Sequence, residues 1–236
     1  MLILGIDTSG RQGSVALVRA QGEELLTLEL APISGGQYSE RLVPVIAELL
    51  AHHGIERSGV GLIAVASGPG SFTGLRIAIA TVKGLAEAFA TPVVDVSVLE
   101  AIAIASGAEG KVVAALDAQR SEVFFGEYAV APGGTEPARK NREALAGFDD
   151  FTALLARGGL APKVFTPDEA LAARLRAASI DAEILARPSA EAFARIAYGK
   201  FLAGIRTDVA TLDANYLRRS DAEIFSSPKG GLGSQA

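Results

Sequence analysis

Apolar residues in the first part of the chain follow the spacing of strands and then of strands alternating with helices. Three apolar runs, 2–7, 14–20 and 24–30, are separated by turns that contain glycine, and they predict three strands in a meander. Short buried runs then alternate with longer segments of helical period, which is typical of α/β layers. The further elements predicted here are helices over 39–53, 71–90 and 98–105 and strands over 62–66 and 93–96.

The pattern begins again at Lys111. Two strands are predicted over 112–117 and 122–130, and Pro132 then opens a polar loop that we expect to reach about Arg142. Beyond this loop the predicted elements are helices over 149–157, 168–178 and 190–202 and strands over 164–165 and 183–185. The sequence therefore predicts an N-terminal domain over 1–107, a C-terminal α/β domain over 108–225 and a disordered Gly/Ser-rich tail over 226–236.

Two predicted hairpins look like copies of one unit. In each, an aspartate ends an apolar strand and precedes a polar turn, as Asp7-Thr8-Ser9 in the first copy and Asp117-Ala118-Gln119-Arg120-Ser121 in the second. Two such hairpins that face each other across a cleft form the phosphate clamp of actin-like ATPases. The second hairpin lacks the glycines that would let its backbone approach a phosphate, so we expect a degraded clamp. An ordinary Asx turn at Asp7 remains the competing interpretation.

The helix over 71–90 has two faces that avoid charge. Leu75, Ile79, Val82, Ala86 and Phe89 form one stripe at helical spacing and are expected to face the core. The adjoining face carries small residues with one larger apolar side chain, namely Gly74, Ile77, Ala78, Thr81, Gly84 and Ala88. Such a helix is buried on two sides, and the second burial is either within the same domain or against a partner. Ser71 or Thr73 is expected to cap it, as Ser39 is for the helix over 39–53.

Composition and charge exclude several classes of function. The chain has 236 residues and no cysteine, which excludes disulfides, thiolate metal sites and a cysteine nucleophile. The net charge of −5 provides no basic field for gripping a phosphate backbone, so we expect contact with nucleic acid only through a partner. No apolar stretch approaches the ~18 residues of a membrane span, and the short apolar N-terminus reads as a buried strand rather than a signal sequence. We therefore expect a cytoplasmic location.

The two histidines, His52 and His53, are adjacent in sequence. Neighbouring residues on a helix point about 100° apart, so they are poor metal ligands and are better explained as favourable charges at a helix C-terminus. No serine–histidine–acid set or zinc-protease motif can be assembled, which makes a protease a remote hypothesis.

Three segments carry a resemblance to a known family. They are MLILGIDTS at 1–9, SGPGSFTGLRIAIATVKG at 67–84 and YLRR at 216–219, and together they resemble the TsaB (YeaZ) family. Ala214-Asn215 departs from that pattern, because a proline is usual just before the tyrosine. The resemblance implies the actin-like, sugar-kinase-like fold with two related α/β domains. It also implies a non-catalytic subunit in the synthesis of N6-threonylcarbamoyladenosine next to the anticodon of tRNAs.

The resemblance further implies partners and sites. The partners would be TsaD, which transfers the threonylcarbamoyl group, and the ATPase TsaE, with a homodimer through the same surface as a second arrangement. The partner surface would lie on the helices over 39–53 and 71–90, at Leu42, Ile46, Leu49, Gly74, Ile77, Ala78, Thr81, Gly84 and Ala88. We expect no catalytic residue, no metal site and no cofactor bound by the chain alone.

Nucleotide binding leaves two interpretations. In the first, ATP or ADP with Mg²⁺ binds at the interface with TsaD, where the candidate phosphate contacts are Asp7, Thr8, Ser9, Ser71 and Thr73. In the second, the chain is itself a small-molecule kinase or ATPase whose cleft is formed by Asp7 and Asp117.

Overall fold

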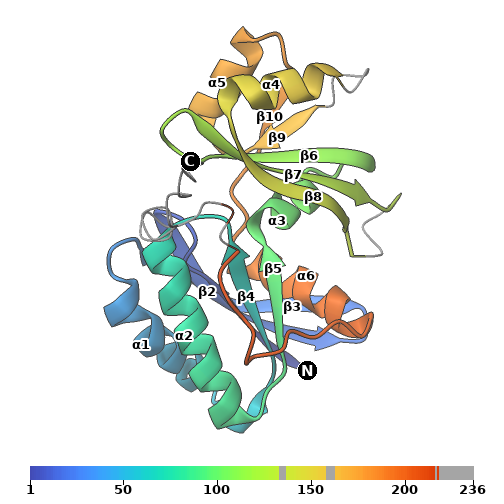
Figure 1. The fold of residues 1–236 in the computed structure, drawn as a ribbon. Helices are drawn as coiled ribbons and strands as arrows, with labels where there is room; N and C mark the ends of the chain where they lie inside the picture. The colour runs from blue at the N-terminus through green and yellow to red at the C-terminus, as the bar shows by residue number, and fades with distance from the viewer. Residues whose placement is uncertain (133–136, 158–162, 216, 218–236) are drawn as a thin grey trace, which may run out of the picture.

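The computed structural model describes residues 1–132, 137–157, 163–215 and 217. Part of the predicted polar loop, Tyr216, Arg218 and Arg219 of the third resembling segment, and the predicted tail over 226–236 lie outside the described residues. Within the described chain, two α/β units are stacked one above the other (Figure 1). The expected fold class, two related α/β domains with mixed sheets flanked by helices, is confirmed.

The first sheet has five strands in the order β3-β2-β1-β4-β5. The meander β1, β2 and β3 is antiparallel, and β4 and β5 add to β1 in parallel. The elements of this part are β1 (Leu2–Asp7), β2 (Gln12–Gln21), β3 (Glu24–Ser34), α1 (Tyr38–His52), η1 (Arg57–Gly59), β4 (Val60–Gly68), α2 (Phe72–Phe89), β5 (Val93–Ser97) and α3 (Val98–Ala105).

The second sheet has the same topology, with five strands in the order β10-β9-β6-β7-β8. Again three antiparallel strands come first and two parallel strands extend the first of them. The elements are β6 (Gly110–Asp117), β7 (Glu122–Val130), β8 (Arg139–Gly147), α4 (Phe148–Arg157), β9 (Val164–Thr166), α5 (Glu169–Ala177), β10 (Ala182–Ile184) and α6 (Ala190–Leu202). The prediction that the two halves repeat one unit is confirmed.

Strand β8 was missed by the sequence prediction, which placed a polar loop up to about Arg142. The strand begins at Arg139 and pairs antiparallel with β7. Its first four residues, Arg-Lys-Asn-Arg, are all exposed and show no apolar alternation. Charged residues are common on edge strands because they discourage pairing with another sheet, so hydrophobic periodicity gives no signal there.

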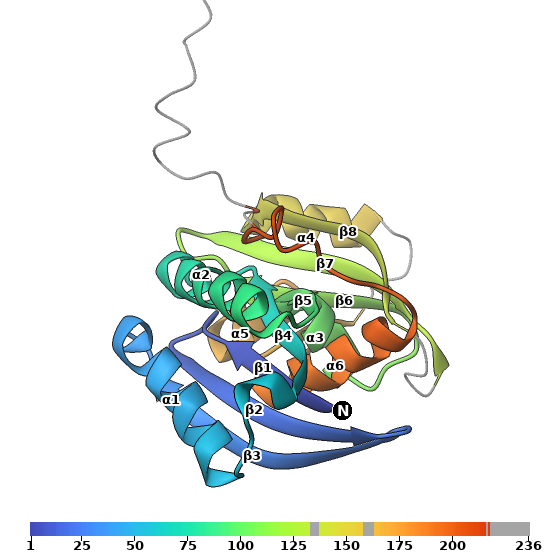
Figure 2. The ribbon, with the colours of Figure 1, turned by 90° about the horizontal axis from the view of Figure 1, so that it is seen from below.

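The helices form layers around the two sheets. Helices α1 and α2 cover the outer face of the first sheet, and α4 and α5 cover the outer face of the second (Figures 1 and 2). Helices α3 and α6 lie between the sheets, and each packs against the sheet of the other half. Helix α3 contacts mainly β6 and β7 and also touches β4 and β5 of its own sheet, whereas α6 contacts β1, β2, β3, β4 and β5.

Three hydrophobic clusters correspond to these layers. The central one joins the inner faces of both sheets with α3 and α6, and it includes Tyr128 and Phe193. The alternation along β1 shows how a strand contributes to two clusters: Ile3 faces the central cluster, while Leu4 and Ile6 face α1 and α2. The two halves are therefore joined by one continuous apolar core.

One helix of the predicted C-terminal domain packs on the first sheet. The boundary between 107 and 108 falls where the chain passes from the first sheet to the second, but α6, which was assigned to the C-terminal domain, lies on the first sheet. The approach is close: a Cβ added to Gly5 of β1 would lie 2.3 Å from the carbonyl oxygen of Ala190. The Ala190 amide also donates to Ser14 Oγ at 2.9 Å. Helical periodicity predicts α6 itself but not the sheet that it covers.

None of the described helices combines the length and the apolar character needed to cross a bilayer.

We expect opposite effects from the same substitution at one glycine inside this contact and one outside it. Gly5→Ala should lower the free energy of unfolding by about 1–3 kcal/mol, because the new methyl group would overlap the backbone of α6. Gly199→Ala, within α6, has nothing within 4 Å of the added Cβ and should raise it by up to about 1 kcal/mol through helix propensity. Urea unfolding of both variants measures the two changes. Equal effects would contradict the packing of α6 on β1.

Candidate functional site

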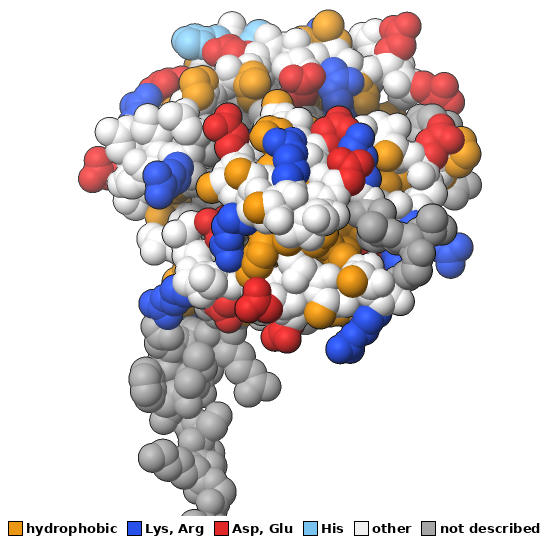
Figure 3. Space-filling model, turned by 90° about the horizontal axis from the view of Figure 1, so that it is seen from above, with side chains coloured by type: hydrophobic (Ala, Val, Ile, Leu, Met, Phe, Trp, Pro, Cys, Tyr) orange, Lys and Arg blue, Asp and Glu red, His pale blue; other side chains and the backbone are white. Residues whose placement is uncertain are grey.

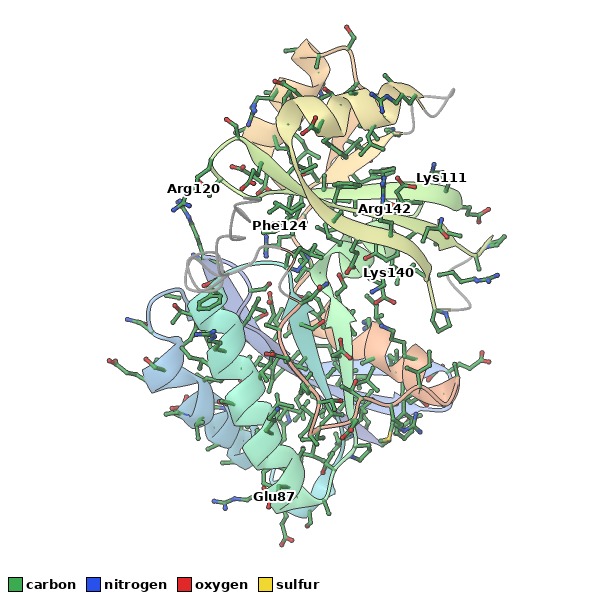
Figure 4. The ribbon with its side chains drawn as sticks, viewed as in Figure 1. Glu87, Lys111, Arg120, Phe124, Lys140 and Arg142 are labelled. Atoms are coloured by element: carbon green, nitrogen blue, oxygen red, sulfur yellow. The ribbon has the colours of Figure 1, made fainter. Side chains whose placement is uncertain are left out.

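A cleft of about 1260 Å³ lies between the two hairpin turns. The first hairpin contributes Ser9 and Arg11, and the second contributes Asp117, Gln119 and Arg120. Further lining comes from the loop and helix start at 69–75, from the start of α5 and from the segment before α6. Arg120 and Phe124 lie on the cleft side of the upper domain (Figure 4). The prediction that the two hairpins face each other across a cleft is confirmed.

The Asp7-Thr8-Ser9 turn is buried and internally bonded. Asp7 Oδ1 accepts hydrogen bonds from Ser9 N at 2.8 Å and from Ser9 Oγ at 2.6 Å, which is an Asx turn. Burial raises the pKa of Asp7, and the hydrogen bonds from Ser9 and the charge of Arg187 lower it by less. Of these three residues only Ser9 lines the cleft. The competing interpretation of the turn is therefore the one that the structure bears out.

The turn also holds the beginning of α2. Thr8 Oγ1 donates to the Gly74 carbonyl at 2.7 Å, and Ser71 N donates to the Ser9 carbonyl at 2.8 Å. The glycines make this approach possible, since a Cβ on Gly74 would lie 2.1 Å from the Thr8 carbonyl oxygen and one on Gly70 would lie 2.3 Å from that of Ser9. The glycines of the 67–76 segment thus serve contact between the loop and the turn.

Ser71 caps α2, which confirms one of the two predicted alternatives. Its Oγ accepts from Gly74 N at 3.2 Å. Ser71 and Thr73 are both exposed and both line the cleft. The expected cap of α1 by Ser39 is wrong: the N-cap is Gln37, which makes no side-chain cap bond, and Ser39 lies in the first turn.

Two residues that the sequence analysis did not single out complete the floor of the cleft. Arg187 reaches back from the segment before α6, and its Nη2 donates to Ser9 Oγ at 3.1 Å. Its Nε is buried and has no hydrogen-bond partner among the described residues. Tyr38 donates to the Gly10 carbonyl at 2.8 Å, and burial together with the nearby Asp7 raises its pKa to about 12. No local sequence signal identifies either residue, because each reaches the turn from a distant part of the chain.

The second hairpin keeps a backbone that glycines would favour. Gln119, Arg120 and Ser121 have φ values of 63°, 53° and 60°. A left-handed conformation costs a non-glycine residue about 1–2 kcal/mol. The Asp117 carboxylate stabilises the turn by accepting from Gln119 N at 2.9 Å and from Gln119 Nε2 at 3.1 Å. Asp117 N in turn donates to Asp168 Oδ2 at 2.7 Å.

A magnesium–nucleotide complex does not fit this cleft as the chain builds it. Both Asp117 oxygens and one Asp7 oxygen are engaged by donors of their own turns, and side chains stand on the second turn where a phosphate clamp has glycines. Among the residues that the structure describes, no group of three or more His, Asp and Glu side chains is arranged to hold a metal ion. Single-chain kinase or ATPase chemistry through Asp7 and Asp117 is therefore not supported by the geometry.

The histidines lie away from the cleft. His52 Nδ1 and His53 Nε2 contact the Glu29 carboxylate at 3.6 and 3.0 Å. They form a pale blue group at one edge of the face seen in Figure 3, where acidic and basic side chains are otherwise interspersed. Neither histidine is placed to activate a serine of the cleft.

Five of the nine predicted partner residues are buried in their own domain. Leu42, Ile46 and Leu49 are 1%, 3% and 1% exposed, and Gly74 and Ala78 are also buried. They pack in the cluster that α1 and α2 form with the first sheet, or against the turn at Thr8. For these five residues the prediction of a partner contact is wrong, since helical spacing groups residues on one face without saying what covers that face.

Four predicted partner residues remain accessible. Ile77 and Thr81 are half-buried, and Gly84 and Ala88 are exposed. Three further residues of the same layer are exposed and were not predicted from the sequence: Val43 on α1, which is 56% exposed, and Phe72 and Ala80 on α2. Seven accessible residues of these two helices are small or apolar, and we call them the α1/α2 face: Val43, Phe72, Ile77, Ala80, Thr81, Gly84 and Ala88.

Comparisons with known proteins place these features in a family. The sequence model described as "TsaD: tRNA N6-adenosine threonylcarbamoyltransferase" matches residues 32–198. The chain is 39% identical to the tRNA threonylcarbamoyladenosine biosynthesis protein TsaB of Haemophilus influenzae over 131 residues, 54% of this chain and 53% of that protein. It is 37% identical to the Escherichia coli protein of the same name over 133 residues, 54% of this chain and 55% of that protein. The chain thus spans about half the length of the curated relatives it matches.

A solved structure matches over a longer span. YeaZ from Pseudomonas aeruginosa is 28% identical, with a TM-score of 0.70, over 91% of this chain and 100% of that one. The likeness therefore covers both α/β domains, beyond the region in which the sequences of the relatives align.

Ser121→Gly is expected to stabilise the protein. Glycine adopts the left-handed conformation of this position without strain, so the free energy of unfolding should rise by about 0.5–1 kcal/mol after the entropic cost of glycine. Ser39→Gly is the matched control, because Ser39 is also exposed but has helical geometry; there glycine should cost up to about 1 kcal/mol. Thermal unfolding of both variants shows whether each substitution raises or lowers the stability. A loss of stability in Ser121→Gly would contradict the strained turn.

Asp7 is expected to make stability fall as the pH rises. Its pKa is raised in the folded protein, so the folded state holds this proton to a higher pH than the unfolded state does. The contribution of protonated Asp7 is present at low pH and is lost as the pH rises from about 4 through the folded pKa. Relative to Asp7→Asn, which cannot titrate, the wild type should lose stability over this range in urea unfolding.

Proposed function

Because this chain belongs to the TsaD family, on its TsaB (YeaZ) side, we propose that it is an accessory, non-catalytic subunit in the cytoplasmic synthesis of N6-threonylcarbamoyladenosine in tRNA. One observation carries the non-catalytic role. The turn that would bind a phosphate in an active relative instead binds α2, through Thr8 to Gly74 and Ser71 to Ser9. The polar groups that chemistry would need are used to fix the position of a helix.

The proposed partner surface is the α1/α2 face. Its small side chains allow a second backbone to approach closely, and Val43 and Phe72 supply exposed apolar area. TsaD is the proposed partner at this face, with TsaE joining the pair, and self-association of the chain would use the same residues in the absence of TsaD. The net charge of −5 supports contact with tRNA through the partner rather than through this subunit.

The proposed place for a nucleotide is the junction with TsaD. Ser71 and Thr73 are exposed at the N-terminus of α2, at the cleft end of the α1/α2 face, where a partner could supply the glycine-rich contacts that this chain lacks. Calorimetry with ATP and Mg²⁺ tests this: the isolated chain should give no binding signal, and the mixture with TsaD should give one. Binding by the isolated chain would instead favour a kinase or ATPase.

Ala88→Glu is expected to abolish association with TsaD while leaving the fold intact. Ala88 is exposed, so the carboxylate is hydrated in the free chain and buried without a partner in the complex, at a cost of several kcal/mol. Ala173→Glu on α5 is the matched control, since it makes the same change at an exposed helical alanine on the other domain. Light scattering of each variant, alone and mixed with TsaD, gives the masses. Unimpaired binding by Ala88→Glu would remove the α1/α2 face from the proposal.

Reconstitution tests the function as distinct from the surface. TsaD, TsaE and the threonylcarbamoyl-adenylate synthase should modify tRNA at least tenfold more slowly without this chain, if it supports the catalytic subunit by the ~1.4 kcal/mol that a factor of ten represents. Full activity without the chain would overturn the proposed role. Activity of the chain alone would overturn its non-catalytic character.

A further inference from the structure

After α6 ends, the chain runs back over the edge of the first sheet as a strap, residues 207–215. Thr207 N donates to the Val93 carbonyl at 2.9 Å, and Thr207 Oγ1 donates to Asp95 Oδ1 at 2.7 Å. Leu212 and Ala214 are buried in the cluster beneath α1 and α2. Figures 1 and 2 show this orange-red segment leaving α6 and passing along the first domain toward the second sheet. The strap is therefore fixed to the first domain along its length.

Its last part is bonded to both domains. Asn215 N donates to the Ser67 carbonyl at 2.7 Å, at the end of β4 in the first sheet. Asn215 Nδ2 donates to Glu143 Oε2 at 2.6 Å, on β8 of the second sheet. One residue thus joins the end of β4 in the first domain to the edge strand of the other domain. Neither bond could be made by a proline, which lacks the backbone donor and the amide side chain.

The acceptor of the side-chain bond is a buried carboxylate. The Glu143 side chain is 3% exposed, and its other oxygen accepts a hydrogen bond from Tyr128 OH. Burial and the charge of Glu143 raise the pKa of Tyr128, so the phenol stays protonated and remains a donor. Lys140 Nζ, which is largely exposed, lies 3.7 Å from Oε2. Loss of the Asn215 amide would leave a buried charge short of one donor.

A second polar contact lies between the two sheets. Lys200 of α6 donates to Glu100 Oε2 of α3 at 2.7 Å and to the Asp95 carbonyl at 3.3 Å. This pair holds α3 and α6 to each other, and the strap contacts the same Asp95 through Thr207. The Asn215 contact is different in kind, because it links the sheets at the side of the cleft: Asn215 itself and Leu217 line the cleft.

We propose that the strap sets the width of the interdomain cleft through the hydrogen bond between Asn215 and Glu143, which keeps the two domains together beside the cleft. We call this contact the catch. While the bond is made, the second domain is held against the end of β4 at Ser67. When it is broken, the sheets stay joined through α3 and α6, and the cleft side opens about that central core. The catch acts on the isolated chain, so it does not rest on the proposed function.

Distance measurement between two spin labels tests the catch. The chain has no cysteine, so Glu40→Cys on α1 and Glu169→Cys on α5 place the only two labels, at exposed positions in the first turns of helices on either side of the cleft. Pulsed electron–electron spectroscopy should give one narrow distance distribution for the wild type. Asn215→Asp sets a carboxylate against Glu143 and should shift the distribution to longer distances and broaden it. Asn141→Asp, the same change at the exposed asparagine of β8, should leave it unchanged.

A double variant separates the catch from general destabilisation. Asn215→Asp combined with Glu143→Gln exchanges donor and acceptor across the same contact and should restore the narrow distribution. If Asn215→Asp does not fold, Asn215→Ser, which keeps the backbone donor and removes the side-chain bond, should show the longer distances. A wild-type distribution in a folded Asn215→Asp or Asn215→Ser chain overturns the proposal, as does a double variant that stays open.

Discussion

The exchange of α3 and α6 is the constraint on which the rest of the structure depends. Each half of the chain places its third helix on the sheet of the other half, so the central apolar cluster belongs to both halves at once. A sheet that has lost this helix would expose the inner face of five strands to water, at about 25 cal/mol for each Å² of apolar surface. Neither half can therefore form its complete core alone. The exchange also places the two hairpin turns on opposite sides of one cleft.

The facing turns have been put to a structural use. In the first turn, Thr8 and Ser9 bind the start of α2, and Asp7 closes the turn that makes this possible. In the second, Gln119 and its neighbours keep a left-handed backbone with side chains that a phosphate would have to displace. The two turns face each other across the cleft, and their donors serve internal contacts. An accessory role beside a catalytic relative agrees with this division, because the retained rigidity positions α2 and hence the α1/α2 face.

Polar contacts between the two domains fix the position of particular atoms in a junction that is otherwise apolar. Hydrophobic contact between α3, α6 and the sheets holds the halves together but permits sliding, whereas hydrogen bonds fix particular atoms. Lys200 with Glu100 joins the exchanged helices, and Asn215 with Glu143 joins the sheets beside the cleft. Because Asn215 also bonds Ser67, the orientation of the second domain is connected to the loop that begins α2. The bonds of Asn215 thus connect the cleft with the start of α2, and so with the α1/α2 face.

The sequence by itself determined the elements and their repetition. Periodicity predicted α2, α3 and α6 to within about a residue, and the two Asp-ended strands predicted the facing hairpins. It also identified the segment at 67–84 by which the family is recognised. These features follow from the spacing of apolar and polar residues within short segments, which the sequence shows directly. The polar edge strand β8 was not predicted, because its pairing with β7, rather than its own residue pattern, makes it a strand.

Only the tertiary structure decided what each face meets. Gly74 and Ala78 share a helical face with Gly84 and Ala88, yet the first two are buried and the last two are exposed. Helix α6 has an apolar stripe that would suit either sheet, and Arg187, Tyr38 and Asn215 reach the cleft from distant segments. The physical reason is that spacing along one element defines which side chains are neighbours on it, whereas burial depends on contacts between residues far apart in the chain.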